Sequence, residues 1–179
     1  TLDYLGLAHR DSSRRYSIGP AMHILAAQSM AASGLFARAL PHLQTLSKYN
    51  KLVALGVLWK DQVCYLYHNS DPGNFSAGLS QIKLYPALNS SIGVALLAEL
   101  PEDQVKAILG DKYTGKVAKL LKKTNKQGYA ALRHSDHVSL ALPIGSPAYA
   151  AIAVSNIKTK EEEDSFRKLL KKAVSEINK

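Results

Sequence analysis

A face of small and hydroxyl-bearing side chains is the part of this sequence best suited to binding a small molecule. Residues 138–155 contain two apolar runs, VSLALPI and AYAAIAVS, joined by a Gly-Ser-Pro turn, and they predict a β-hairpin. One face of this hairpin is apolar. The other is lined by small residues, with Ser139 and Ser155 on it and His137 at one end. Small residues on a sheet face leave volume, and a few polar groups around such a volume predict a ligand pocket.

The register of the two strands decides which side chains share that face. Pairing Ile144 with Ala148 across the turn places Ser139 opposite Ala153. A slip of one residue would exchange the two faces of one strand. A face of small residues also suits close packing beneath a helix, so the pattern alone leaves both a cavity and a tightly packed layer open.

A run of small polar residues, Asn89, Ser90 and Ser91, precedes the apolar stretch 92–98 and predicts a helix start with free backbone N–H groups. Helix starts attract carboxylates and phosphates. Ordinary capping requires only one serine, so capping and ligand binding both remain open for this run.

Catalytic motifs are absent from the sequence. It contains no GxGxxG, GxxxxGK[ST], HExxH or GxSxG pattern. His134 and His137, with Asp136 between them, form an incomplete set of metal ligands, without a Cys or Glu partner. The single cysteine, Cys64, is expected on an apolar strand face, with no histidine or carboxylate placed to activate it. We therefore expect no enzymatic activity, no metal and no cofactor.

The composition of the chain limits its class. With 179 residues, of which 46% are hydrophobic, it can bury a sizeable core and is expected to form one domain with an appendage. We expect no membrane span, because no apolar run approaches ~20 residues, and no secretory signal. The single cysteine fits a reducing compartment, so a cytoplasmic protein is expected. The formal charge of +9 suggests an acidic partner, of which nucleic acid is the commonest.

Two stretches carry notable positive charge. Near the start, Arg10, Arg14 and Arg15 cluster at a polar turn between two short predicted strands. Residues 112–126 contain six lysines and no acid, and five of these lysines recur at spacings of 4, 3, 4 and 3. That spacing places them on one helical face, which is either simply solvated or binds phosphate.

The other segments must position these residues. Helices are expected over 20–33, 35–48, 101–109 and 114–127, and a last helix begins with the capping box Thr159-x-x-Glu162. The run KLVALGVLWKDQVCYLYH predicts a hairpin in which Trp59 pairs with Gln62. A short strand is expected around 79–85. The apolar face of the KLVALGVLW hairpin is expected to carry Val53, Leu55, Val57, Trp59, Cys64 and Leu66.

Five segments resemble, in order, the IclR family of bacterial transcriptional regulators. GLAHRDSSRRYSIG resembles the wing hairpin of that family's winged helix-turn-helix domain. ARALPHLQTLSKYNKLVALGVLWKDQVCYL resembles its A-x-P-x-L-x-x-L helix and first effector-domain strands. PALNSSIGVALLAELP is similar to its pocket loop and the next helix, LLKKTNKQGYA to the helix and Gly-Tyr-Ala before the last strands, and VSLALPIGSPAYAAIAVSN to the closing hairpin.

The resemblance implies an α+β fold. Its main part is a GAF-like domain with a central antiparallel sheet flanked by helices, preceded by a wing hairpin and a linker helix. The implied divisions are 1–19 for the C-terminal remnant of the winged helix-turn-helix domain, 20–34 for the linker helix and 35–179 for the effector-binding domain. The resemblance also implies a homodimer or a dimer of dimers, which is a tetramer.

The resemblance further implies site residues. The family's effector site draws on the loop matching Leu88 to Ser91 and on strand positions matching Ser139, Ala153 and Ser155. The arginines of the wing would contact DNA phosphate or the minor groove. The loop reads LNSSIGV where the family commonly reads like HATALGK, and alanine replaces an expected serine at 153. With His137 added from the strand pattern, the candidate effector-binding residues are Leu88, Asn89, Ser90, Ser91, His137, Ser139, Ala153 and Ser155.

Two classes of function follow. The first is a ligand-responsive DNA-binding transcriptional regulator. This chain would mainly be its effector-binding and oligomerisation domain for a small organic acid, such as a carboxylate, or a similar metabolite. The alternative is a stand-alone GAF-like binding or signalling module, or an enzyme, that does not bind DNA. The wing-like hairpin favours the first class, because a free-standing module has no use for it.

Overall fold

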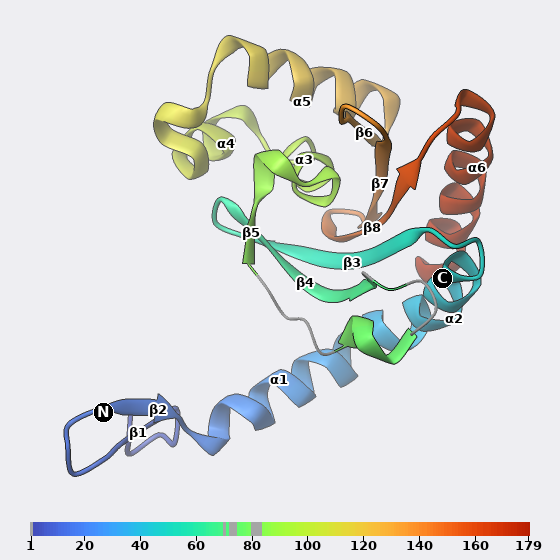
Figure 1. Cartoon of the computed structure of the whole chain (residues 1–179). Coiled ribbons are helices and arrows are strands. Elements are labelled where there is room, and N and C mark those ends of the chain that lie inside the picture. Colours follow the sequence, from blue (N-terminus) through green and yellow to red (C-terminus); the bar gives the residue numbers. More distant parts are fainter. Residues whose placement is uncertain (1, 70, 72–74, 80–83) are drawn as a thin grey trace. The chain divides into compact units, whose positions relative to one another are not determined.

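The computed structural model describes the whole chain except residues 1, 70, 72–74 and 80–83 (Figure 1). Its internal contacts divide the chain into two units, residues 1–38 and 39–179.

The first unit begins with a two-stranded hairpin. Strand β1 (Ala8–Arg10) pairs antiparallel with β2 (Tyr16–Ile18). In the turn, the Asp11 carboxylate accepts hydrogen bonds from the backbone N–H and from Nε of Arg15, both at 2.9 Å. Arg14 adopts a left-handed backbone conformation there, with φ of 62°. The expected pair of short strands around a basic turn is confirmed.

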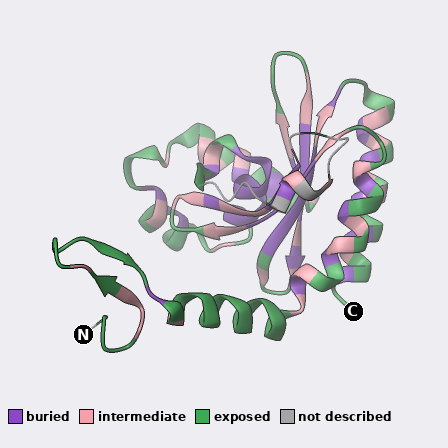
Figure 2. Cartoon of the chain, turned by 60° about the horizontal axis from the view of Figure 1, so that its bottom comes forward, coloured by how far each residue is buried: buried purple, intermediate pink, exposed green. Residues whose placement is uncertain are grey.

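Helix α1 (Pro20–Ser33) follows the hairpin and has the expected range. Pro20 suits the first turn because its fixed φ is helical and its missing N–H has no partner there. Gly34 ends the helix in the left-handed conformation, with φ of 58°. No residue of α1 is buried, and the helix carries no Asp, Glu, Lys or Arg (Figure 2, green). An uncharged helix whose apolar side chains meet water is typical of a surface that another chain covers.

Helix α2 (Leu35–Ser47) contains residues of both units. Pro41 lies inside it without ending it, and Oγ1 of Thr45 donates a hydrogen bond to the Pro41 carbonyl at 2.9 Å. Ala39, Leu43 and Leu46 are buried at the spacing of one helical face, so α2 contributes to the core of the second unit.

The second unit is built on one antiparallel sheet of six strands in the order β5-β4-β3-β8-β7-β6. This confirms the α+β class and the antiparallel sheet. The two expected hairpins, β3–β4 and β7–β8, lie next to each other because β3 pairs with β8. The strands are β3 (Leu52–Trp59), β4 (Gln62–Asn69), β5 (Leu84–Pro86), β6 (Ala130–Arg133), β7 (Val138–Gly145) and β8 (Ala148–Ile157).

Helices flank this sheet, as Figure 1 shows. Helix α3 (Ser91–Leu97) contacts β3, β7 and β8, and α5 (Gly115–Gln127) lies against α3. Helix α4 (Glu102–Leu109) connects them along the chain. Helix α6 (Lys160–Ile177) contacts β7 and β8. Short 3-10 turns cover Phe75–Leu79, Ala87–Asn89 and Gly110–Lys112. Most of the strand expected around 79–85 lies outside the described residues.

The two faces of the β7–β8 hairpin are packed differently. Leu140, Leu142 and Ile152 are at most 4% exposed on the face toward α6. Ala141 and Ala151, which alternate with them, belong to the apolar cluster that includes the residues of α3. The large side chains therefore form the apolar face of the hairpin that packs against α6. The small ones on the opposite face let α3 approach the strands closely.

The observed register of this hairpin differs from the expected one by two residues. Ile144 pairs with Ala150 rather than Ala148, and Leu140 pairs with Val154. The register is irregular between Ile144 and Gly145, and again between Val138 and Leu140, so that Val138 pairs with Ile157. The expected pairs were therefore wrong. The expected faces were nevertheless right, because a shift by an even number of residues leaves each side chain on the same side of the sheet.

The β3–β4 hairpin has the expected pairing at its turn, where Trp59 pairs with Gln62. Trp59 was expected on the core face, and that was wrong, because its side chain is 54% exposed. It is the last residue of β3, and the Nζ atom of Lys60 lies 5.2 Å from its ring centroid. Cys64 is a half-buried free thiol.

The start of α6 gives a first testable prediction. Oγ1 of Thr159 accepts a hydrogen bond from the Glu162 backbone N–H at 3.2 Å, as the capping box predicts. Thr159→Ala removes this acceptor and should lower the free energy of unfolding by about 1 kcal/mol. Urea denaturation of residues 1–179 measures the change. Thr45→Ala, in the last turn of α2, is the matched control, and an equal loss in both variants would contradict a specific role for the cap.

Candidate ligand-binding site

A cavity of about 460 Å³ lies where the β7–β8 hairpin, strands β3 and β4 and the start of α3 meet. Its volume is within the range of about 300–1,000 Å³ that ligand pockets have. The structure brings seven of the eight candidate effector-binding residues into its wall: Asn89, Ser90, Ser91, His137, Ser139, Ala153 and Ser155. The eighth, Leu88, is not part of the wall. Its half-buried side chain packs against the apolar cluster around α3.

Both interpretations of the small-residue face apply, at different positions along it. Ala141 and Ala151 are fully buried in the close-packed cluster with α3. Ser139 and Ser155 lie farther along the strands, where they line the cavity. Their hydroxyl oxygens are 2.5 Å apart and hydrogen-bonded. The hydroxyl pair therefore marks the point where close packing gives way to open volume.

Ser90 explains the polar run before α3. Its hydroxyl accepts a hydrogen bond from the Gly93 N–H at 3.4 Å as the N-cap, and it also bonds with the Tyr65 hydroxyl at 3.0 Å. Burial raises the pKa of Tyr65, so its phenol is neutral at physiological pH. A Cβ on Gly93 would lie 2.2 Å from the Ala87 carbonyl oxygen, which is why a glycine stands there. Ser90 thus caps the helix, and Asn89 and Ser91 line the cavity on either side of it.

A second part of the wall is aromatic. The rings of Tyr65 and His68 lie 4.9 Å apart, and those of Tyr65 and Tyr85 lie 6.4 Å apart. His68 carried no signal in the sequence. The register irregularity after Leu55 turns His68 onto the face of Tyr65, since it pairs with Ala54 there. The position of His68 in the cavity could have been predicted only by predicting the bulge between β3 and β4 as well.

The turn between β6 and β7 supplies the remaining rings. His134 and His137 are stacked, with centroids 4.4 Å apart and planes at 18°. His137 Nδ1 lies 2.7 Å from Oδ1 of Asp136, and Nζ of Lys158 lies 3.1 Å from Oδ2 of the same carboxylate. These two partners lower the pKa of Asp136 to about 2, chiefly through the hydrogen bond with His137. The Asp136 carboxylate is therefore ionised at physiological pH.

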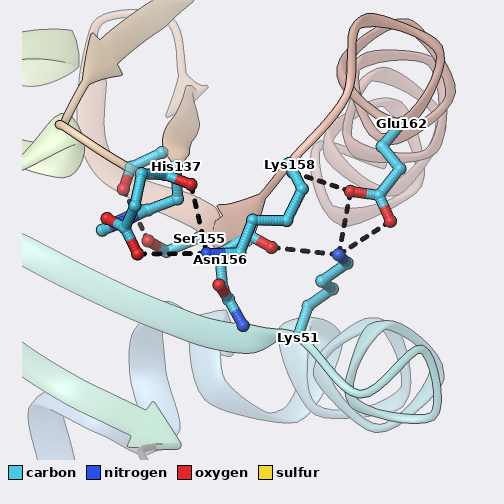
Figure 3. A network of polar contacts seen from close by, with 8 residues as sticks. Lys51, His137, Ser155, Asn156, Lys158 and Glu162 are labelled. Carbon is cyan, nitrogen blue, oxygen red and sulfur yellow. Dashed lines mark hydrogen bonds and ion pairs between the residues drawn. The ribbon is translucent and has the colours of Figure 1, made fainter.

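This polar network continues away from the cavity (Figure 3). The backbone N–H of Lys158 donates to a carboxylate oxygen of Glu162 at 2.8 Å. Nζ of Lys51, which precedes β3, donates to Glu162 at 2.8 and 2.9 Å and to the Asn156 carbonyl at 2.9 Å. These bonds hold the start of β3, the end of β8 and the start of α6 together behind the cavity wall.

Neither a family model nor a curated protein matches the chain, but solved structures do. It superposes on a proposed IclR transcriptional regulator from Silicibacter sp. TM1040 with a TM-score of 0.81 and 20% identity, over 99% of this chain and 78% of that one. For a proposed transcriptional regulator from Rhodococcus sp. RHA1, the TM-score is 0.71 and the identity 22%, over 99% of this chain and 79% of that one. For an IclR homologue from Microbacterium hydrocarbonoxydans, complexed with 4-hydroxybenzoate, the TM-score is 0.68 and the identity 20%, over 99% of this chain and 80% of that one.

This chain has the IclR fold. The expectation of an antiparallel sheet flanked by helices, which rested on the resemblance to this family, is confirmed. The likeness extends over nearly the whole chain, so it includes the hairpin and α1 as well as the second unit. In the described part of the chain, no helix combines the length and the apolar character that crossing a membrane requires.

The three arginines predicted to contact DNA lie on the hairpin of this IclR fold, and all are exposed. Arg15 is ion-paired with Asp11, and the guanidinium of Arg10 lies 5.6 Å from the ring centroid of Tyr16. Arg14 occupies the turn itself. The hairpin therefore presents its basic charge at its tip, and the DNA-binding role of these residues stays a prediction.

Other candidate features of the IclR fold lie elsewhere. A second hollow, of about 620 Å³, opens between α4 and α5 and includes none of the predicted site residues. Lys119 and Lys122, from the lysine-rich helix, line this hollow, while Lys112 is ion-paired with Asp61 at 2.6 Å. Among the residues that the structure describes, no three histidine, cysteine or acidic side chains are grouped to hold a metal ion.

Proposed function

We propose that this chain is the effector-binding and oligomerisation part of a ligand-responsive DNA-binding transcriptional regulator of the IclR type. In this proposal residues 1–19 are the end of a winged helix-turn-helix domain, residues 20–34 link the domains, and residues 35–179 bind the effector. The protein acts in the cytoplasm and is not an enzyme. The half-buried free thiol of Cys64 suits that reducing compartment.

The observation that carries the proposal is the cavity beside Ser139 and Ser155. It has the size of a ligand pocket, and its wall combines hydroxyl groups, imidazoles and small side chains from five separate segments of the chain. An IclR homologue with a similar fold has been solved with 4-hydroxybenzoate, which supports a small organic acid as the effector. A neutral polar metabolite is the second choice, because no arginine lines the described wall.

A homodimer, or a dimer of dimers, is part of the same proposal. Its support is α1, which exposes Met22, Ile24, Leu25 and Met30 and carries no charged side chain. Apolar surface of this kind is costly to leave in water and is typical of an interface between chains.

The DNA part of the proposal is tested at the hairpin. In the regulator with its complete DNA-binding domain, Arg14→Ala with Arg15→Ala should weaken binding similarly for all DNA sequences, because phosphate contacts carry no sequence information. The slope of log K against log salt should become shallower by about 2. Fluorescence anisotropy across a salt series measures both effects.

Two exposed lysines of α6 give the matched control. Lys171→Ala with Lys172→Ala removes the same charge and should leave DNA binding unchanged. Residues 1–179 alone should bind DNA weakly and without preference. Nanomolar, sequence-selective binding by residues 1–179 would contradict the placement of base recognition outside this chain. If the arginine changes leave DNA binding unaltered, that result would favour a module that does not bind DNA.

A further inference from the structure

Charged side chains are missing from the described wall of the cavity. No lysine, arginine, aspartate or glutamate contributes to that part of the wall, and its ionisable nitrogens belong to His68, His134 and His137. A carboxylate that enters such a cavity loses its hydration and needs a cation or several donors in return. Within the described wall, only a protonated imidazole can supply that charge.

His134 and His137 are held as a pair by the backbone between them. The backbone N–H of His134 donates to the His137 carbonyl at 2.8 Å, which closes a tight turn and keeps both rings at one end of the cavity. The rings are stacked with centroids 4.4 Å apart.

Asp136 fixes how His137 meets the cavity. Its carboxylate lies 2.7 Å from Nδ1, so Nδ1 carries the hydrogen and Nε2 is the nitrogen left for a ligand. Lys158 neutralises the same carboxylate and also donates to the Asp136 carbonyl at 3.1 Å. The negative charge next to the histidine is therefore balanced and does not repel an anion.

We propose that His134 and His137 are the anion-recognition element of this cavity, and that its ligand is a small carboxylate which binds together with a proton. Without that proton, Nε2 of His137 is an acceptor and opposes a carboxylate. With it, the same atom donates a charge-assisted hydrogen bond. This inference rests on the proposed effector-binding function and names the chemistry of the same site.

The other titratable groups around the pair are either paired with an opposite charge or are aromatic rings farther along the wall, so binding of the anion falls to the imidazoles of His134 and His137. Asp136 and Lys158 compensate each other on the outer side of His137. On the wall formed by β4 and β5, Tyr65 and Tyr85 are phenols, and the ring of His68 lies tilted against that of Tyr65. Glu162 lies behind the wall and is paired with Lys51. Imidazole is the side chain whose charge changes between pH 5 and 8, so ligand affinity should follow pH in that range.

Calorimetry on residues 1–179 tests the proposal directly. The probes are acetate, succinate, benzoate and 4-hydroxybenzoate, each paired with its neutral amide, from pH 5.5 to 8.5. At least one acid should bind most tightly at pH 5.5, where an imidazole already carries its proton, and it should take up a proton as it binds near pH 8, as measured in buffers of different ionisation enthalpy. Its Kd should rise by about tenfold per pH unit toward pH 8.5, and the matching amide should bind weakly at every pH.

Variants assign the effect to the histidine pair. His137→Gln keeps hydrogen-bonding groups without the titratable charge, and it should raise the Kd of the acid at pH 5.5 about tenfold and remove the proton uptake. His134→Gln should reduce both effects. His9→Gln, on the exposed strand β1, is the matched control and should behave as the unchanged protein. Thermal unfolding without ligand verifies that each variant folds.

The outcomes separate this inference from the proposed function. An acid that binds equally at pH 5.5 and 8.5, or an amide that binds as tightly as its acid, overturns the role of the histidine pair but leaves the cavity as a ligand site. The same conclusion follows if His137→Gln binds the acid as the unchanged protein does. Failure of every acid and every amide to bind overturns both the inference and the effector-binding function.

Discussion

Ser139→Leu is expected to abolish the stabilisation of the protein by its ligand. A ligand at a hundred times its Kd should raise the free energy of unfolding by roughly 2.7 kcal/mol. Leucine at this position would fill the volume beside Ser155 and remove the hydroxyl that is hydrogen-bonded to it. The measurement is the shift of the unfolding temperature with each carboxylate probe, and we expect no shift in the variant.

Two further variants control this experiment. Ser139→Ala removes the hydroxyl and keeps the volume, so it should retain part of the shift. Ser175→Leu makes the same exchange on the exposed side of α6 and should retain all of it. A Ser139→Leu protein that folds and keeps the full shift would mean that ligands bind elsewhere, and the hollow between α4 and α5 would then be the next place to examine.

The second large effect is expected at α1. Residues 1–179 should sediment as a dimer or larger at tens of micromolar protein, because the interfaces of such assemblies are usually large. Ile24→Lys with Leu25→Lys should produce monomers, since both side chains are more than half exposed in the single chain and a buried lysine pair would cost several kcal/mol at an interface. Sedimentation velocity distinguishes the species.

Trp59→Lys is the matched control for assembly. It also replaces a large exposed apolar side chain with lysine, but at the tip of the β3–β4 hairpin rather than on α1. We expect this variant to assemble normally. A monomer in the unchanged protein, or an assembly that survives both lysines on α1, would contradict the assignment of this helix to the interface.

The strands and helices of this fold could be predicted because their signals are local. The capping box at Thr159 and the two-residue turn after Trp59 each depend on a few neighbouring residues, and both are present in the structure. The pairing of Ile144 depends on the register irregularity between Ile144 and Gly145, which no short pattern specifies. The faces were still predicted correctly, since the error was an even number of residues.

The candidate site could be predicted in part for the same reason. Ser139 and Ser155 share a face because side chains alternate along each strand and the error in register was even, and both line the cavity. His68 reaches the wall through a bulge, and His134 through the tight turn that stacks it on His137. Both depend on backbone geometry that composition and periodicity do not contain. Leu88 was included by resemblance, and its side chain packs with the core instead.

The pairing of β3 with β8 has a consequence for how the protein is made. β3 lies in the middle of the sheet, yet its partner Ser155 follows Leu52 by about a hundred residues. During synthesis, β3 and β4 emerge with one long apolar edge open, and an open edge of this kind invites pairing with other chains. The cavity floor, where Ala54 meets Ala153, forms only when β8 arrives. A nascent chain should therefore gain ligand binding and protection from aggregation in the same late step.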